Sequence, residues 1–440
     1  MPSFDANEQP TVKIAFVFYE YPPDTADGGI ATYLRQAARV LCARGHQVEV
    51  FAGARDREGT FDDGDGITVH RIACADGRAH FYRPVAAAFH QRHTAVGFDV
   101  VEGADYLADA RDIPARCPEI PLVVRLHTGT YLLNRLNRPH VSSMFKLRVV
   151  RDNWRQWMRR SYWRYDKARD VERLHALDAD HIASPCLAMS EVMVAVWDLD
   201  PQRVALVPPP YVPPETLLNV PVETCTNTVT FLGRLEVRKG VLDLARAIPH
   251  ILRRHPEVRF RFVGRPHHYS PQPGLDMRQY LTRELDRYEK AVEFAGWVAP
   301  DQVPDALGRT DICVFPSVWE AWGYTCAEAM AAARGVLGSN AGGMADLLAP
   351  DSDATEVGLR IPPNHPKYLA KAVSQLLERR EWRLEMGRRA RRRIVKDYGV
   401  TAIGPKLEDC FLRAIEHRRR LGPRKTALGR RVTALRTSPQ

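Results

Sequence analysis

The 440-residue sequence predicts an α/β protein made of two facing Rossmann-like domains with parallel sheets. Each half begins with an apolar run, at residues 12–19 and 229–232, that is typical of a strand buried on both faces. In each half a glycine turn follows, and then an amphipathic helical pattern. A proline-rich stretch at 209–228 separates the halves, and we interpret it as a linker with few core contacts.

Residues 1–208 form the first predicted domain. After its first strand, Gly28 and Gly29 open a helix, and a second strand is predicted at 47–52. Glycines at such a turn let the backbone approach a bound group closely, and the helix N-terminus favours an anion. The fingerprint Gly-x-Gly-x-x-Gly does not occur there, which disfavours a nicotinamide or flavin dehydrogenase. Further strands are predicted at 67–72, 98–102, 122–126, 181–184 and 204–207.

His127 comes directly after the strand predicted at 122–126. This is the position at which α/β sheets place ligand contacts. A single histidine there is more often structural, so its type alone does not decide between the two roles.

Residues 229–401 form the second predicted domain. Its first strand leads directly into a turn that carries Arg234 and Lys239, just before a helix predicted at 241–254. A strand, a Gly-Arg turn and a lysine before a helix make a cationic pocket of phosphate size, although both residues could also be ordinary surface charges. Further strands are predicted at 258–264, 292–298, 311–315 and 358–361, with two helices between 366 and 396.

The stretch 316–346 concentrates acids, glycines and helix-start signals. Thr325 and Glu328, three residues apart, predict a capping box at the start of a helix, and Gly335 is predicted to end that helix. Glu328 could serve only as the capping partner of Thr325.

The loop before this helix carries Glu320. Backbone N–H groups of residues 321–324, together with the positive end of the helix, are placed to face an anion. Glu320 and Glu328 can then line one crevice, although Glu320 alone could be an exposed loop acid.

The order of these residues resembles the signature of the family 4 retaining glycosyltransferases, which have the GT-B fold. Glu320 and Glu328 form a Glu-x7-Glu pair that is interrupted by Trp322-Gly323 and followed by Gly342-Gly343. Two departures are visible. Trp322 stands where the family usually has Phe, and Asp346 stands where it usually has Glu, so the shorter Asp346 side chain alters the reach.

The resemblance implies a role for each residue. In the family, the first Glu approaches donor-sugar hydroxyls and the second hydrogen-bonds the ribose, while the Gly-Arg and Lys-Gly positions hold the donor diphosphate. The histidine contacts the donor sugar or the acceptor. The resemblance therefore implies catalytic roles for Glu320, His127, Arg234 and Lys239. The donor-binding residues it implies are Gly28, Gly29, Arg234, Lys239, Arg265, Trp297, Val298, Glu320, Ala321, Trp322, Gly323, Tyr324 and Glu328, of which Trp297 could equally be a core residue.

The implied reaction is transfer of a hexose-type sugar, with retention, from a nucleoside-diphosphate sugar to a hydroxyl acceptor. UDP is favoured as the nucleotide and GDP comes second, while the acceptor could be a glycan, a lipid-linked molecule or a small natural product. The Asp-x-Asp strings at 63–65, 178–180 and 351–353 lie in turns or at element ends. We therefore expect no metal and no cofactor, the nucleotide-sugar being a co-substrate.

Two rival functions remain open. One is a nucleotide-sugar epimerase of the same two-domain fold, which the arrangement around Glu320 and Glu328 disfavours. The other is a non-catalytic basic protein that binds a membrane or a polyanion.

The net charge of +10 comes from two segments. Residues 135–173 hold 12 Arg and Lys against 4 Asp and Glu, and residues 418–440 hold 8 Arg and Lys and no acid. The first segment has Trp and Tyr at helical spacing, which predicts either a helix packed on the domain or a surface for an acceptor or an anionic membrane. Nucleic acid is an unfavoured partner, because no recognised binding motif accompanies the charge.

Neither a secretory signal nor an apolar run long enough to cross a bilayer is apparent, and the eight cysteines are scattered. We therefore expect a cytoplasmic protein, at most peripheral to the inner face of the membrane. The helical segment 402–420 is expected to cross back to the first domain, and 421–440 to be a disordered basic tail.

Overall fold

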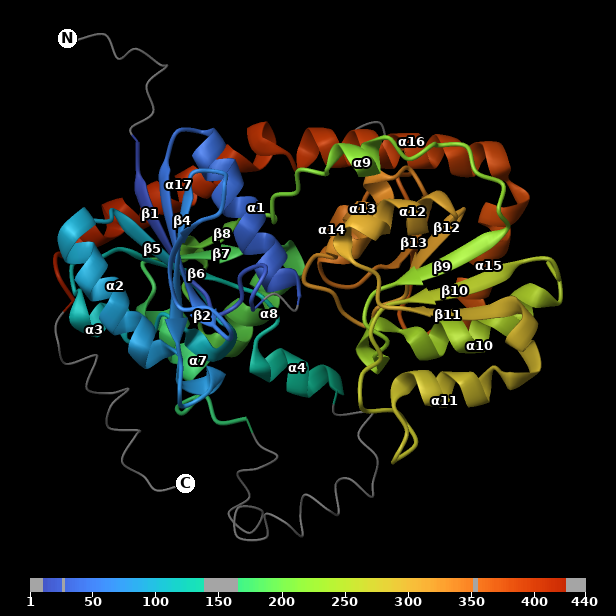
Figure 1. Ribbon diagram of the computed structural model, residues 1–440, viewed down its shortest axis with the longest axis horizontal. Helices are drawn as coiled ribbons and strands as arrows, with labels where there is room; N and C mark the ends of the chain where they lie inside the picture. Colours follow the sequence, from blue (N-terminus) through green and yellow to red (C-terminus); the bar gives the residue numbers. More distant parts are fainter. Residues whose placement is uncertain (1–10, 26–27, 138–164, 351–354, 425–440) are drawn as a thin grey trace.

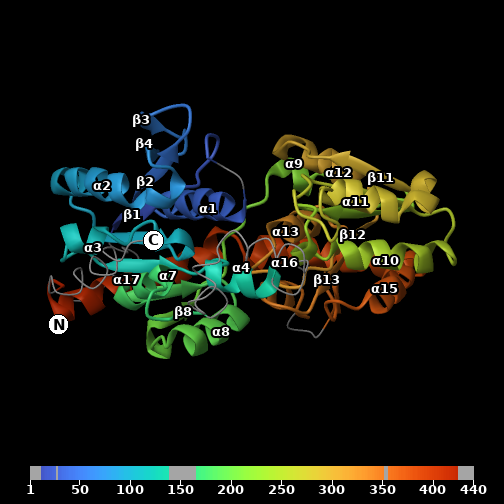
Figure 2. The ribbon, with the colours of Figure 1, turned by 90° about the horizontal axis from the view of Figure 1, so that it is seen from below.

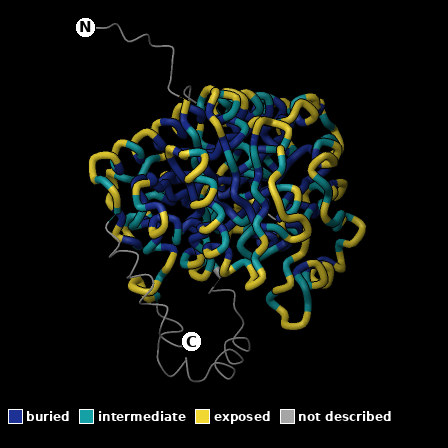
Figure 3. The backbone as a smooth tube through the Cα atoms, turned by 60° about the vertical axis from the view of Figure 1, so that its left-hand side comes forward, coloured by how far each residue is buried: buried dark blue, intermediate teal, exposed yellow. Residues whose placement is uncertain are grey.

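The computed structural model describes residues 11–25, 28–137, 165–350 and 355–424. Two sheets lie side by side, and helices cover both faces of each (Figures 1 and 2). The α/β fold class predicted from the sequence is confirmed. Buried backbone follows the sheets, while exposed residues gather in the loops around them (Figure 3).

The first sheet has the strand order β3-β4-β2-β1-β5-β6-β7-β8 within the described residues. All neighbouring strands are parallel except β3 and β4. Strands β5, β6 and β7 are buried along their whole length, as a sheet between two helical layers requires. The strands are β1 Lys13–Val17, β2 Gln47–Ala54, β3 Gly59–Asp62, β4 Ile67–Ala73, β5 Val100–Ala104, β6 Leu122–Arg125, β7 His181–Ser184 and β8 Val204–Leu206.

The second sheet is parallel throughout its described strands and has the order β11-β10-β9-β12-β13-β14. The sequence analysis missed β13. The strands are β9 Thr228–Leu232, β10 Arg259–Val263, β11 Val292–Gly296, β12 Ile312–Phe315, β13 Gly335–Ser339 and β14 Leu359–Ile361.

The helices form two layers on each sheet. In the first half they are α1 Gly29–Ala43, α2 Tyr82–Val96, α3 Ile113–Arg116, α4 Thr130–Asn137, α7 Val171–Asp178 and α8 Leu187–Trp197. The linker carries α9 Glu215–Leu218. In the second half they are α10 Val241–Leu252, α11 Met277–Glu284, α12 Val303–Gly308, α13 Tyr324–Ala331, α14 Gly343–Leu347, α15 Pro366–Glu378, α16 Arg380–Asp397 and α17 Val400–Leu421.

The start of α13 corrects the predicted capping box. The helix begins at Tyr324 with Gly323 as its N-cap, at φ +115°, and no side chain caps it. Thr325 is therefore a helical residue. Gly335 does not end the helix either, because Ala333 already turns the chain at φ +56° and Gly335 is the first residue of β13.

The linker at 209–228 contradicts the expectation of few core contacts. Tyr211, Leu217 and Val220 are buried in a hydrophobic cluster that contains residues of both sheets. The Arg334 guanidinium also donates to the carbonyl of Pro221. The linker therefore ties the two halves together through apolar burial and hydrogen bonds.

The C-terminal helix α17 packs on α1, β5, β6 and β7 of the first sheet, far from the second sheet that precedes it in sequence (Figure 1). Beyond it, the chain is still docked, which corrects the expectation that 421–440 is disordered from its first residue. The Arg424 backbone N–H donates to the Pro118 carbonyl at 2.9 Å, and its side chain binds Asp180.

Two expectations fall on residues outside the described ranges. Most of the basic aromatic segment, residues 138–164, and most of the basic tail, residues 425–440, are among them. In the part of the chain that is described, no helix combines the length and the apolar character needed to cross a membrane.

Candidate active site

Both sheets reverse their strand order at one point. In the first sheet the chain builds outward from β1 on one side and from β5 on the other, and in the second sheet β9 and β12 are the corresponding pair. Ligands of open α/β sheets bind outside the carboxyl ends of the strands at such points. The loops after β1, β9 and β12 carry Gly28, Arg234, Lys239 and residues 320–323, and the two domains meet where Gly29 faces Tyr324.

Lys239 and Glu320 form an ion pair at this junction. Lys239 ends a short 3₁₀ turn and precedes Gly240, whose left-handed φ of +74° and lack of a side chain allow the backbone to lie against Pro316. A Cβ on Gly240 would lie 1.9 Å from the Pro316 carbonyl oxygen. This close packing brings the lysine turn to the loop that carries Glu320.

Glu320 is held in its charged form. Burial raises the pKa of its carboxyl, but the Lys239 and Arg238 cations lower it more, so the net pKa lies below the usual range. Ser317 Oγ lies 3.4 Å from the same carboxylate oxygen that Lys239 binds.

Arg238 is a residue that the sequence analysis missed. Its guanidinium binds Glu236 Oε1 at 2.7 Å and reaches the Trp319 carbonyl at 3.4 Å. Its own carbonyl accepts from the Val318 N–H at 2.8 Å. Arg238 therefore braces the loop from 317 to 320. In the sequence, Arg238 is simply a second cation beside Lys239, and nothing there indicates that it braces the loop.

Glu328 lies in α13, about one turn after the helix begins at Tyr324. Burial raises the pKa of its carboxyl to about 7, far above that of a free glutamate. The two acids of the Glu-x7-Glu pair therefore differ at neutral pH: Glu320 is ionised, while Glu328 is close to its midpoint.

The Gly342-Gly343 pair supports the Glu320 backbone. Gly343 N–H donates to the Glu320 carbonyl at 2.7 Å, and Gly342 pairs with Glu320 as an isolated parallel bridge. A Cβ on either glycine would lie 2.2 Å from a backbone carbonyl oxygen, that of Glu320 or of Ala321. Glycine is required at both positions because two backbones meet here.

Asp346 contacts the other domain. Its Oδ2 accepts from the Leu187 backbone N–H, at the first residue of α8, at a distance of 3.1 Å. Asp346, which stands where the family usually has Glu, thus makes a contact between the two domains.

The first domain supplies Gly28, Gly29 and His127. A Cβ on Gly29 would lie 3.7 Å from the Tyr324 ring, so the start of α1 faces the start of α13. The His127 backbone N–H donates to Asp105 Oδ1 at 2.9 Å. Burial, and after it the Arg125 cation, lowers the pKa of His127 to about 3, so its ring is neutral.

The remaining predicted residues differ in their burial. Arg234 and Arg265 are exposed, and Arg265 Cζ stands 4.7 Å from the centre of the exposed Trp297 ring. Val298 is half-buried against the core. The Trp322 side chain is buried among Tyr211, Tyr324 and Tyr398, so only its backbone can face a ligand.

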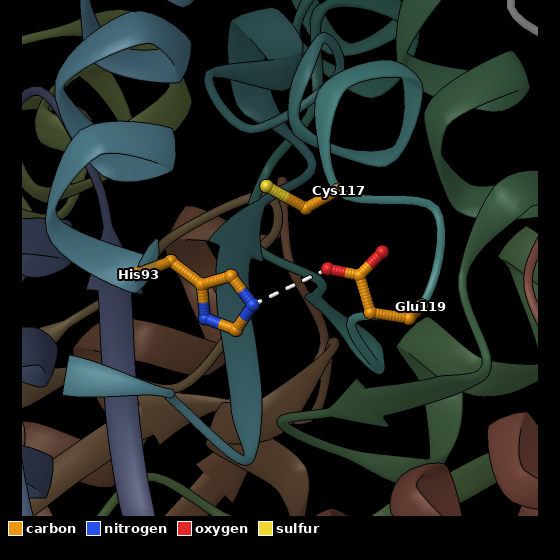
Figure 4. A group of neighbouring side chains, drawn as sticks. All are labelled: His93, Cys117 and Glu119. Atoms are coloured by element: carbon orange, nitrogen blue, oxygen red, sulfur yellow. Dashed lines mark ion pairs between the residues drawn. The ribbon is translucent and has the colours of Figure 1, made fainter. Parts of the chain in front are cut away.

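Within the described ranges, one group of His, Cys and acid side chains has metal-ligand spacing: His93, Cys117 and Glu119 (Figure 4). It does not fit a metal well. His93 Nδ1 accepts from the Phe98 N–H at 3.1 Å, which leaves the proton on Nε2, 3.3 Å from Glu119 Oε1. Burial also raises the pKa of the Cys117 thiol to about 11, whereas metal ligation requires the thiolate.

Two facing α/β domains with an acid pair, a lysine and a glycine turn at their junction define a GT-B glycosyltransferase. Two family models match the chain: "Glycosyl transferase 4-like domain" over residues 28–210 and "Glycosyl transferases group 1" over residues 226–379. The chain belongs to the family 4 glycosyltransferases, and the predicted resemblance is confirmed.

Relatives of nearly full length exist. An uncharacterized glycosyltransferase of Methanocaldococcus jannaschii is 23% identical over 92% of this chain and 99% of its own. The D-inositol 3-phosphate glycosyltransferase of Kineococcus radiotolerans is 26% identical over 90% of this chain and 93% of its own.

Solved structures share the fold. Sucrose-phosphate synthase from Thermosynechococcus elongatus has a TM-score of 0.69 at 19% identity and covers 92% of this chain and 99% of its own. Anabaena HepE in complex with UDP-glucose has a TM-score of 0.61 at 18% identity, over 90% of this chain and 98% of its own. At these identities the likeness establishes the GT-B fold alone.

Proposed function

We propose that this glycosyltransferase moves a hexose-type sugar from a nucleoside-diphosphate sugar to a hydroxyl acceptor, with retention at the anomeric carbon and without a metal ion. The observation that carries the proposal is the Lys239–Glu320 ion pair beside the start of α13. It brings together a cation for a diphosphate and an ionised carboxylate for sugar hydroxyls.

The chemical demand is to stabilise the diphosphate as the glycosidic bond breaks. Lys239, Arg234 and the backbone N–H groups at the start of α13 would supply positive potential from fixed positions. The Gly28-Gly29 turn adds the N-terminus of α1 from the other domain.

The two acids would bind the hydroxyls of the donor. Glu320, ionised at neutral pH, accepts hydrogen bonds from the sugar, and Glu328 from the ribose. Because Lys239 occupies one oxygen of Glu320 before a donor arrives, the diphosphate replaces the carboxylate as the partner of Lys239. Glu320 is thereby released for the sugar.

Without an enzyme nucleophile, retention requires the acceptor to enter on the face that the diphosphate leaves. A neutral His127 can orient a hydroxyl by hydrogen bonding and does not bring a second positive charge. We assign no enzyme nucleophile. The acceptor attacks with assistance from the departing diphosphate.

UDP is the favoured nucleotide and GDP the second. Support for UDP comes from HepE, a neighbour in fold whose structure holds UDP-glucose. For the acceptor, we propose only that it supplies a hydroxyl group.

Replacing Arg234 tests the leaving-group assignment. Loss of one preorganised charge typically costs about 10² to 10³ in rate. We expect Arg234→Ala to lower kcat by that factor at an unchanged melting temperature. Arg246→Ala, which removes an exposed arginine of α10, is the matched control and should keep full activity. Wild-type turnover by Arg234→Ala would refute the assignment.

Stereochemistry and metal dependence need separate measurements. NMR of the first product formed should show the anomer of the donor, and the opposite anomer would overturn retention. Activity should survive exhaustive treatment with EDTA, whereas rescue only by a divalent cation would overturn metal independence.

A further inference from the structure

A second polar cluster lies under α1, beside the proposed donor site. Its centre is Arg125, the last residue of β6, which is fully buried. In the described chain its three guanidinium nitrogens have no hydrogen-bond partner. A buried cation without a partner is costly, so it calls for an explanation.

Glu102 shares the face from which Arg125 projects. The register of the parallel strands β5 and β6 pairs Ala104 with Arg125 and Glu102 with Val123, so Glu102 and Arg125 stand two positions apart on one face. Glu102 is also fully buried. Its Oε1 accepts from the Tyr33 hydroxyl at 2.6 Å.

Tyr33 joins the two charges to His127. Arg125 Cζ stands 4.2 Å from the centre of the Tyr33 ring, a cation–π contact that partly offsets the burial of the charge. The Tyr33 ring also meets the His127 ring edge-on, with centres 5.4 Å apart. His127 also packs edge-on against Phe18 at 6.0 Å.

The groups around His127 come from four elements. Arg125 ends β6, the strand that His127 follows, and Asp105 follows β5 and accepts from the His127 backbone N–H. Phe18 follows β1, and Tyr33 comes from α1. Arg125 is the charge that acts on the His127 ring, and it acts on Tyr324 of the other domain as well. The cluster therefore reaches the domain junction.

We propose that Arg125 and Glu102 are positioning residues, which through Tyr33 fix the His127 ring at the domain junction. A cation next to a histidine opposes a second positive charge, and the glutamate keeps the tyrosine in place. The catalytic consequence rests on the proposed function, in which His127 contacts the donor sugar or the acceptor. The placement of the His127 ring by Tyr33, Arg125 and Glu102 does not rest on the proposed function.

The test uses the full chain with Glu102→Gln and Arg125→Met combined. This variant removes both charges, and the introduced glutamine can still accept a hydrogen bond from the Tyr33 hydroxyl. Removing two opposite buried charges together is tolerated far better than removing only one of them. The protonation of His127 is followed by NMR from pH 8 downward, with its signal assigned through His127→Asn.

His175 is an internal control in the same spectra. It is buried, and burial followed by Arg111 and Arg424 lowers its pKa to about 3, so Arg125 has no part in it. We expect the pH at the midpoint of the His127 titration to rise in the double variant, while that of His175 is unchanged. An unchanged His127 midpoint would overturn the proposal.

Kinetics give the second readout. We expect kcat to fall about 10-fold to 100-fold because the ring is no longer fixed, with the donor KM within about twofold. Wild-type kcat would overturn the positioning role. The NMR result holds even if the proposed sugar transfer is refuted. Should the double variant not fold, Tyr33→Phe, which removes only the hydroxyl that binds Glu102, must lower kcat in the same way, and wild-type kcat in that variant would overturn the proposal.

Discussion

Glu320 and Glu328 are one residue type with opposite environments. Burial acts on both, but Glu320 has Lys239 and Arg238 beside it, so the pKa of Glu320 falls and the pKa of Glu328 rises. The sequence spacing places both acids near the site, yet it carries no information about these cations. Thr325, the partner that the sequence suggested for Glu328, is not a cap.

Glu328 gives stability a dependence on pH. Between about pH 4.5 and 7 the folded protein holds a proton that the unfolded chain has released, so the free energy of unfolding falls as pH rises. Glu328→Gln removes this loss. We expect the free energy of unfolding of the variant to rise relative to that of wild type from pH 5 to 7. Above pH 7 the difference between the two should become constant, as measured by urea unfolding at each pH. A difference that does not vary with pH would contradict the burial of Glu328. Glu102, whose pKa is also about 7, is present in both proteins and cancels.

At the residue scale, the sequence patterns pointed to Glu320 and Lys239, which the structure brings together as an ion pair, and to His127, which follows β6. They gave no sign of Arg125 and Glu102. Arg125 and Glu102 lie within apolar strands, where a single charged residue gives no indication of a role. Only the pairing of β5 with β6 shows that they share a face.

Among the elements, the long apolar runs were predicted at nearly their observed bounds, and β3, β13 and α14 were among those missed. β13 holds two glycines for packing reasons. A Cβ on Gly335 would lie 2.6 Å from Arg383 Cγ, and one on Gly338 would lie 2.6 Å from Leu348 Cδ1. The glycines that allow helices to pack closely weaken the strand signal in the sequence.

The turn before α14 offers a test at this scale. Gly343→Ala places a methyl group 2.2 Å from the Ala321 carbonyl oxygen, so the loop carrying Glu320 must shift. We expect a loss of about 1–3 kcal/mol in the free energy of unfolding, together with weaker donor binding. Gly308→Ala is the control, because a Cβ there meets no atom within 4 Å. Equal effects of the two substitutions would show that the turn does not support the loop.

Over the whole molecule, the C-terminal segment closes the structure through one buried carboxylate. Asp180 is fully buried. Its Oδ1 accepts from Arg418 at 2.6 Å, while its Oδ2 accepts from the Leu122 N–H at 2.9 Å and binds Arg424. The sequence predicted that the last helix returns to the first domain but gave no sign of this anchor. His417 Nδ1 also lies 3.0 Å from Asp180 Oδ1. These four partners are separated from Asp180 by 58 to 244 residues along the chain.

Asp180→Ala should therefore destabilise the protein by about 3–5 kcal/mol, because it leaves buried arginines without a counter-charge. Asp409→Ala is the control, since Asp409 forms an exposed pair with Arg413 and should cost less than about 1 kcal/mol. Denaturant unfolding measures both. A small loss at Asp180 would mean that α17 is held by its apolar face alone.

The central claim is that the domain junction binds a nucleoside-diphosphate sugar without a metal. The most direct measurement is thermal shift with UDP, GDP, ADP and their sugars, in EDTA and then in magnesium, for wild type, Arg234→Ala and Arg246→Ala. A ligand at about 100 times its Kd adds about 2.7 kcal/mol of stability. We predict a shift with one nucleotide in EDTA that persists in Arg246→Ala and disappears in Arg234→Ala. A shift that requires magnesium, or no shift with any nucleotide, would contradict the claim.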